Sequence, residues 1–348
     1  MIDLNLLGEK AKVAASALNG LSQEKIDRAL KAAAKALTDN ADSIISANAK
    51  DVIAARKKGL SAAFIDRLTV SGKTLDGMAE GLLQIAELKS PVGQVVYEYE
   101  NKEQGISVVK KRVPFGVVGI IFESRPNVTA DAFGLCFKTR NAVILKGGSD
   151  ALLSNAAIVS VLRGALKENG VDENAVALIN DVSRETANAF MKLNKYVDLL
   201  IPRGGAGLIR AALENATVPV IETGTGNCHI FVDESAKTEM SANVIFNAKT
   251  QRYSVCNACE SLVIHEKALN RVLPAIYDRL AEKGVEMRCD EESFEILGGR
   301  PNVVRATDDD FYTEYGDAII SVKTVKDISE AIEHINSHST RHSESIIT

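Results

Sequence analysis

Long hydrophobic runs, an excess of positive charge and a dense set of cysteines are all missing from this 348-residue chain. No apolar stretch approaches the roughly 20 residues that a membrane-spanning helix requires. The formal net charge of −5 provides no basic field for nucleic acid, so a nucleic-acid partner is not expected. The N-terminal sequence MIDLNLLGEKAKVAA meets charged residues too early to form the apolar core of a signal peptide.

The five cysteines, without a secretory signal, indicate reduced thiols and a cytoplasmic protein. The remaining composition is that of an ordinary globular protein, with 46% hydrophobic and 25% charged residues. Because a single hydrophobic core stops growing at roughly 250–300 residues, the length favours two domains.

The first ninety residues show helical periodicity, and Ser22 is the expected N-terminal cap of one helix. Residues 94–112 alternate in polarity and contain Gly105, which predicts two extended strands joined by a turn. The apolar positions that recur at helical spacing after Ser22 are Ile26, Leu30, Ala33 and Leu37.

Beyond residue 116, short apolar runs alternate with helical patterns, which is typical of parallel sheets covered by helices on both faces. The pattern predicts two α/β domains with a boundary near residue 223. The predicted strands are 117–122, 142–145, 176–179, 197–201, 218–221, 229–232, 261–265, 302–305 and 318–323. The predicted helices are 151–168, 184–194, 206–214, 239–249, 267–282 and 327–336.

The sharpest local signal is the segment QRYSVCNA at 251–258, between a predicted helix and a predicted strand. A thiolate of Cys256 in such a loop could attack a carbonyl or an acyl phosphate and form a covalent intermediate. The alternative is that Cys256 is a small core residue. Cys256 and Cys259 also have C-x-x-C spacing, which suits a redox pair or half a zinc site. No second pair follows at suitable spacing, so we expect no metal and interpret Cys259 as a core neighbour.

Three further strand ends resemble parts of a dinucleotide site. The first places Lys146 before two glycines and Ser149, and the second places Gly204 and Gly205 before a predicted helix. Glycines in such a turn let backbone N–H groups approach a pyrophosphate, although a plain βα turn has the same sequence features. The third ends in Glu222, which could act as a base or as a hydrogen-bond anchor.

Taken together, these segments closely resemble the γ-glutamyl phosphate reductases of proline biosynthesis, within the aldehyde dehydrogenase superfamily. The resemblance covers essentially the whole chain, and the order of its motifs makes it specific. They are VPFGVVG (113–119), FESRPNVT (122–129), the Lys146 glycine turn, IETGTGNCH (221–229), SVCNA (254–258) and a signature over 325–346 that includes His334 and His342-Ser343-Glu344.

The resemblance implies a Rossmann-like cofactor domain at 1–223 and a catalytic cysteine domain at 224–348, both three-layer α/β. It also implies an N-terminal helical segment and a β-ribbon at 94–112 that serves oligomerisation. The implied reaction is the NADPH-dependent reduction of L-glutamyl 5-phosphate to L-glutamate 5-semialdehyde through a cysteine thioester. A homo-oligomer and a functional link to glutamate 5-kinase are implied as well.

The same resemblance suggests residue roles. Cys256 is the nucleophile, and Asn127 stabilises the oxyanion together with the Cys256 backbone N–H. Lys146 and Ser149 hold the adenosine ribose and its phosphate, and Gly204 and Gly205 lie beneath the pyrophosphate. Glu222 falls at the general-base position of hydrolytic relatives. Arg125 and Arg252 are the acyl-phosphate candidates on charge alone, with exposed surface arginine as the alternative.

The sequence departs from the family pattern at a few positions. Tyr253 stands where relatives carry proline, and Arg140 and the turn at 338–341 lack a customary glycine. If position 140 requires a positive φ, arginine costs about 1 kcal/mol relative to glycine. The chain also ends at Thr348, several dozen residues before the family does, so we expect a fragment that is poorly active or prone to aggregate through its unpaired ribbon.

Two other functions remain open from the residues. A hydrolytic aldehyde dehydrogenase would share Cys256, Asn127 and Glu222. A nucleotide-binding module without turnover would need only the glycine turns, and NADPH binding without catalysis would select it.

Overall fold

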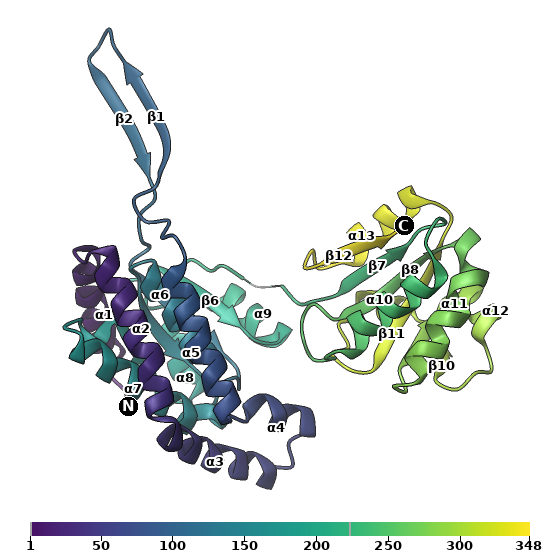
Figure 1. The fold of residues 1–348 in the computed structure, drawn as a ribbon, viewed down its shortest axis with the longest axis horizontal. Helices are drawn as coiled ribbons and strands as arrows, with labels where there is room; N and C mark the ends of the chain where they lie inside the picture. The colour runs from purple at the N-terminus through teal and green to yellow at the C-terminus, as the bar shows by residue number, and fades with distance from the viewer. Residues whose placement is uncertain (1, 223) are drawn as a thin grey trace. The chain divides into compact units, whose positions relative to one another are not determined.

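The computed structural model describes residues 2–222 and 224–348. The chain divides into two compact units, Met1–Thr223 and Gly224–Thr348, and each has its own parallel sheet (Figure 1). Each unit also has its own hydrophobic core. Among the described residues, no helix combines the length and the apolar character needed to cross a bilayer.

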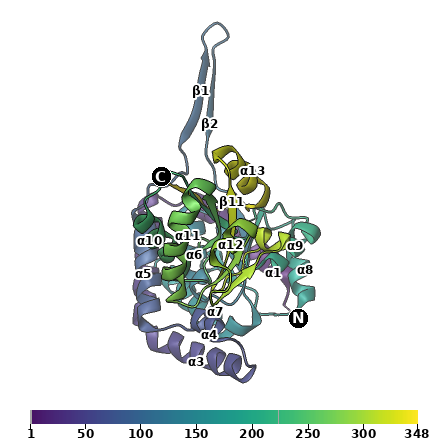
Figure 2. The ribbon, with the colours of Figure 1, turned by 90° about the vertical axis from the view of Figure 1, so that its right-hand side faces the viewer.

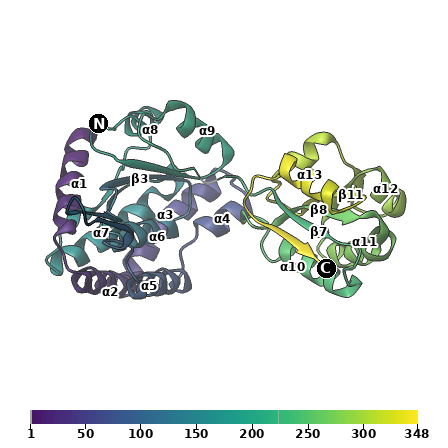
Figure 3. The ribbon, with the colours of Figure 1, turned by 90° about the horizontal axis from the view of Figure 1, so that it is seen from above.

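Five helices begin the N-terminal unit, and their sequence signals agree with the structure. The Ser22 side chain accepts a hydrogen bond from the Lys25 backbone N–H, and the apolar positions at helical spacing behind it are fully buried. Helix α2 packs side by side with α5 (Figure 3). The helices are α1 (Leu4–Asn19), α2 (Gln23–Asp39), α3 (Ala41–Lys57), α4 (Ala62–Leu68) and α5 (Gly72–Glu87).

The predicted pair of extended strands is confirmed as an antiparallel hairpin of β1 (Val95–Asn101) and β2 (Ile106–Lys111). Gly105 adopts a φ of 65° in its turn, a conformation that glycine reaches without a side-chain clash. The hairpin projects away from the sheet of its unit (Figure 2). Its apolar side chains are exposed on both faces, including Val95, Val96, Tyr97, Tyr99, Ile106, Val108 and Val109.

The sheet of the N-terminal unit has the order β5-β4-β3-β6, and all its strands are parallel. Its strands are β3 (Val117–Phe122), β4 (Ala142–Lys146), β5 (Val176–Leu178) and β6 (Leu199–Arg203). Its helices are α6 (Asn127–Lys138), α7 (Leu152–Glu168), α8 (Arg184–Met191) and α9 (Ala206–Asn215). The predicted strands at 117–122, 142–145 and 176–179 are confirmed to within one residue, and the strand predicted at 197–201 begins and ends two residues later.

The strand predicted at 218–221 is wrong. Only Val220 forms a bridge there, opposite Leu200. The Leu200 N–H donates to the Pro219 carbonyl and the Ile221 N–H donates to the Leu200 carbonyl. Pro219 has no N–H to extend the ladder, so the apolar run yields one bridge instead of a strand.

The C-terminal unit has a parallel six-stranded sheet with the order β10-β9-β11-β8-β7-β12. Its strands are β7 (Cys228–Val232), β8 (Cys259–His265), β9 (Glu286–Cys289), β10 (Val303–Arg305), β11 (Ile319–Val325) and β12 (Glu344–Ile347). Its helices are α10 (Thr238–Thr250), α11 (Glu266–Ala281), α12 (Glu291–Leu297) and α13 (Ile328–His338). The sequence pattern did not predict β9, α12 or β12, because each is short and contains charged residues.

Two positions where the sequence lacks an expected glycine do adopt positive φ. Arg140 has a φ of 58° and Arg341 a φ of 59°. Arg140 follows the C-cap of α6, where the Asn141 N–H donates to the Cys136 carbonyl in the manner of a Schellman motif. The Arg140 Nε is also buried without a hydrogen-bond partner in the described part of the chain.

Replacing Arg140 with glycine is expected to stabilise the N-terminal unit. Glycine removes the steric cost of the left-handed conformation, so Arg140→Gly should raise the free energy of unfolding by about 1 kcal/mol. Urea denaturation followed by circular dichroism measures this change. The matched control is Arg28→Gly inside α2, which should lower stability by about 1 kcal/mol. Equal destabilisation by both substitutions would contradict the account.

Candidate active site

Cys256 lies in the loop that joins α10 to β8. The loop therefore precedes β8 and lies beside the start of β7, at the amino ends of two parallel strands. This edge is opposite to the carboxyl edge at which α/β sheets usually bind ligands. The prediction of a loop at a strand end is confirmed, but the loop lies at the amino end of the strand, which is the less usual edge for a ligand site.

The backbone of Cys256 is held in a tight seat formed by residues 226–228. A Cβ atom built on Gly226 would lie 1.7 Å from the Cys256 carbonyl oxygen, so no side chain fits at that position. The Cys228 thiol donates a hydrogen bond to the same carbonyl oxygen at 3.1 Å. Within the loop, the Ala258 N–H donates to the Val255 carbonyl. The peptide of Cys256 is thus fixed from two directions.

The environments of the five cysteines differ, and all five are free thiols. Cys256 is half-buried, whereas the other four are buried. Burial raises the pKa of the Cys136, Cys228 and Cys259 thiols to about 12 and that of Cys289 to about 11. Those four thiols are protonated at neutral pH, so Cys256 is the one accessible candidate for a nucleophile.

Cys259, the second cysteine of the C-x-x-C spacing, is buried in the sheet of the C-terminal unit. Cys259 is the first residue of β8, and it lies in register with Cys228 of β7. Within the described part of the chain, no three His, Cys, Asp or Glu side chains gather in an arrangement that could hold a metal ion.

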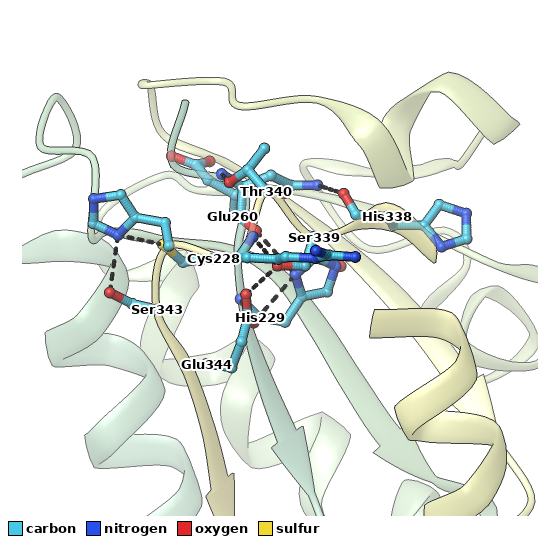
Figure 4. A network of polar contacts seen from close by, with 12 residues as sticks. Cys228, His229, Glu260, His338, Ser339, Thr340, Ser343 and Glu344 are labelled. Atoms are coloured by element: carbon cyan, nitrogen blue, oxygen red, sulfur yellow. Dashed lines mark hydrogen bonds and ion pairs between the residues drawn. The ribbon is translucent and has the colours of Figure 1, made fainter. Parts of the chain in front are cut away.

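A polar network adjoins the Cys256 seat and includes Cys228, His229 and Glu344 (Figure 4). The His342 ring lies against the Cys228 thiol, and the rings of His334 and His338 stack on each other. The Asn227 N–H donates to the Thr340 hydroxyl, and its side-chain amide donates to the carbonyls of Phe311 and His338. The His229 N–H donates to the Glu344 carboxylate at 2.8 Å, and Ser339 donates to the other carboxylate oxygen. This network connects the segment before β12 to the start of β7.

The surroundings lower the pKa values of two groups in this network, His334 and Glu344. Burial, and after it the neighbouring His338, lowers the pKa of His334 to about 3. Burial opposes the charged form of Glu344, but hydrogen bonds from His229 and Ser339 outweigh it and lower the pKa of that carboxyl. Glu344 is therefore an anion at neutral pH, and the His334 imidazole is neutral. The motif containing His342-Ser343-Glu344 was part of the sequence resemblance, but its contact with the Cys256 seat was not predicted.

The predicted cofactor residues meet at the carboxyl edge of the N-terminal sheet. Lys146 ends β4, while Gly204 follows β6, and β3 lies between these two strands. Lys146 is 5% exposed, and burial lowers its pKa against the opposing effect of Asp181. Ser149 is exposed and begins a short 3-10 helix. Gly205 is exposed and forms the N-cap of α9.

At this edge, two glycines lie very close to neighbouring side chains, which the sequence did not indicate. A Cβ on Gly147 would lie 2.2 Å from the Asn155 side-chain nitrogen, which has no hydrogen-bond partner among the described residues. A Cβ on Gly204 would lie 2.7 Å from the Glu123 carboxyl carbon. A side chain at position 147 would therefore have to displace the buried Asn155, whereas one at position 204 would have to displace the exposed Glu123 side chain, which lies against the second turn.

The remaining predicted residues are distributed between the two units. Asn127 begins α6 and is exposed, and its amide donates to Asp131 at 3.1 Å. Glu222 is exposed after the Val220 bridge. Arg125 belongs to the N-terminal unit and Arg252 to the C-terminal unit, so neither unit by itself brings the two arginines together.

Known proteins share this architecture. The model of the aldehyde dehydrogenase family matches residues 3–295. A γ-glutamyl phosphate reductase of Lachnospira eligens is 52% identical over 348 residues, which cover 100% of this chain and 83% of the relative. The corresponding protein of Agathobacter rectalis is 51% identical with the same coverage. The solved structure of γ-glutamyl phosphate reductase from Thermotoga maritima has a TM-score of 0.93 and 45% identity, and the match covers 100% of this chain and 83% of that one.

The fold and the family match define the class: the chain belongs to the aldehyde dehydrogenase family. Identity of about half over the whole chain then places it among the γ-glutamyl phosphate reductases. It is an enzyme that reduces γ-glutamyl phosphate, and the hydrolytic alternative raised by Cys256 and Glu222 is set aside.

Substituting Gly226 tests the seat of Cys256. The methyl group in Gly226→Ala would overlap the Cys256 carbonyl and displace the loop, so turnover should fall by about 100-fold. Gly224→Ala is the matched control, because its Cβ meets only the Thr340 carbonyl at 3.6 Å, an ordinary contact. Steady-state reductase assays of both variants measure the difference. Turnover at the level of the unsubstituted protein in Gly226→Ala would contradict the seat.

Proposed function

We propose that Cys256 is the nucleophile of this reductase and that the acyl group passes through a thioester on its sulfur. The observation that supports this most strongly is the contrast among the cysteines: Cys256 alone is half-exposed, and the buried four have raised pKa values. A thiolate is the nucleophilic form, so the accessible thiol is the reactive one.

The covalent steps balance without a metal. The Cys256 thiolate attacks the acyl carbon, the carbon–oxygen bond to phosphate breaks, and phosphate leaves with the electron pair. Reduction of the thioester leaves the thiohemiacetal as an alkoxide. Its oxygen re-forms the carbonyl as the carbon–sulfur bond breaks, which releases the aldehyde and regenerates the thiolate. Asn127 and the Cys256 backbone N–H donate to the developing oxyanion, and one such donor contributes about 3 kcal/mol.

The cofactor proposed for the reduction is NADPH, which supplies a hydride when bound. Lys146 and Ser149 would hold the ribose and its phosphate, while Gly204 and Gly205 would support the pyrophosphate at the start of α9. Two observations support this fit. Lys146 ends β4 beside Gly147, where a Cβ would overlap Asn155, and the Asn155 side-chain nitrogen has no hydrogen-bond partner among the residues that the structure describes.

The two compact units divide these tasks in the same proposal. Residues 1–223 form the cofactor-binding domain, and residues 224–348 form the catalytic cysteine domain. Glu222 belongs to the first and is exposed, which suits a mobile proton acceptor or an anchor equally. Arg125 and Arg252, one from each unit, are the candidates that match the charge of the substrate phosphate.

Partners follow from the same chemistry. The hairpin β1–β2 exposes apolar side chains and two unpaired edges, which supports its role in a homo-oligomer. The acyl phosphate substrate must be made by a kinase that phosphorylates the side-chain carboxylate of glutamate, so we expect a functional link to glutamate 5-kinase.

The nucleophile is tested by replacing two neighbouring cysteines. Cys256→Ser should abolish reductase turnover, because a hydroxyl is far less nucleophilic than a thiolate, while NADPH affinity stays nearly unchanged. Cys259→Ser should keep most of the turnover, because Cys259 lies in the core. Steady-state kinetics and a fluorescence titration with NADPH measure the two properties. The opposite pattern, with Cys259→Ser inactive and Cys256→Ser active, would refute the assignment.

The preference for NADPH depends on Lys146 in this proposal. Lys146→Ala should weaken NADPH more than NADH, because the lost cation faces the 2′-phosphate that only NADPH carries. Binding titrations with both cofactors measure the ratio. An equal loss for the two would assign Lys146 to the shared ribose or pyrophosphate instead.

A further inference from the structure

A fully buried ion pair joins the two elements that flank the Cys256 loop. Lys249 lies in the last turn of α10, and Glu260 is the second residue of β8. The Lys249 Nζ lies 2.7 Å from a Glu260 carboxylate oxygen, and both side chains are 0% exposed. The chain between these two residues contains the loop with Cys256. The pair therefore closes the base of that loop.

The stability that a buried ion pair contributes does not by itself explain why Lys249 and Glu260 lie in the core. Moving two charges from water into the interior costs several kcal/mol per ion, and well-packed apolar residues of similar volume are often as stable or more so. Burial raises the pKa of Glu260 to about 7 even though Lys249 opposes the shift. An ion pair does, however, fix one distance and one orientation, whereas an apolar contact allows neighbouring elements to slide.

Further contacts fix Glu260 in the same place. The Gly316 N–H donates to its second carboxylate oxygen at 3.3 Å, which connects the pair to the segment before β11. The Ser321 hydroxyl of β11 donates to the Glu260 backbone carbonyl. Glu260 is thus held by the neighbouring strand, and Lys249 transmits that position to the end of α10.

The middle of the loop is held separately by Gly226 and the Cys228 thiol, as described above. We propose that Lys249 and Glu260 are positioning residues that fix the base of the Cys256 loop and so set the approach of its sulfur to the substrate. This inference rests on the proposed role of Cys256 as the nucleophile. Within the described part of the chain, neither charge forms a hydrogen bond or an ion pair with the sulfur, so both act through the loop backbone.

The test separates positioning from stability by removing both charges at once. Lys249→Met and Glu260→Gln each leave one buried charge unpaired, and both single variants should be destabilised. The double variant leaves no unpaired charge, so its melting temperature should recover toward that of the unsubstituted protein. If the pair positions the loop, kcat and the rate of Cys256 alkylation by iodoacetamide should stay lower by about 10- to 100-fold, with KM for NADPH unchanged.

The chain offers a matched control pair in the same unit. Lys267 and Glu234 form an exposed ion pair at 2.8 Å, away from the Cys256 loop. Their double replacement by Met and Gln should leave alkylation and turnover unchanged. Alkylation is read by peptide mass spectrometry on the full chain, and only Cys256 should react in the native state because the other four thiols are buried.

The outcomes distinguish this inference from the proposed nucleophile. Recovery of the melting temperature, kcat and the alkylation rate together in Lys249→Met/Glu260→Gln would show that the pair is only structural and would overturn the inference. If that variant does not fold, Glu260→Asp keeps the charge and shortens the side chain, and unchanged kcat and alkylation there would overturn it equally. Retained turnover in Cys256→Ser would refute the nucleophile itself, whatever the pair does.

Discussion

The carbonyl oxygen of Cys256 approaches Gly226 so closely that a single methyl group does not fit between them. This contact is possible because β7 and β8 are parallel neighbours, so the residues that precede the two strands meet at one edge of the sheet. The Cys228 thiol, the first residue of β7, adds a hydrogen bond to the same oxygen. The sheet register of the C-terminal unit therefore determines where the Cys256 sulfur can be.

The polar surroundings of the seat depend on that register as well. Asn227 can bind the segment before β12 because it immediately precedes β7, and β12 pairs with β7 along the same edge. Glu344, at the start of β12, reaches the backbone of His229 through this pairing. A shift of one residue would move each of these side chains to the other face of the sheet.

The sequence predicted what local patterns can encode. Continuous apolar runs predicted β3, β7 and β8, and the missing glycine at Arg140 correctly indicated a position of positive φ. The run at 218–221 did not form a strand because one proline interrupts the ladder. Strands β9 and β12 were missed because each has only 4 residues and includes a charged one. The loop that carries Cys256 was predicted from its place between a helix and a strand. The seat at Gly226 was not, because a contact between residues thirty positions apart has no local signal.

The surroundings of charged residues were even harder to predict from the sequence. Lysine and glutamate are usually surface residues, yet the side chains of Lys249 and Glu260 are completely buried. Glu123 lies against the glycine turn at Gly204, which the sequence pattern assigned to a phosphate. Burial of charge is decided by tertiary packing, so it becomes visible only in the structure.

If Cys256 carries the acyl group as proposed, phosphate and not water is exchanged at its thioester. The most direct measurement follows the reverse reaction, in which glutamate 5-semialdehyde is oxidised by NADP with and without inorganic phosphate. The rate of NADPH formation should depend on the phosphate concentration and saturate as it rises. NADPH formation at the same rate without phosphate would contradict the account, because water would then be resolving the thioester as in a hydrolytic aldehyde dehydrogenase.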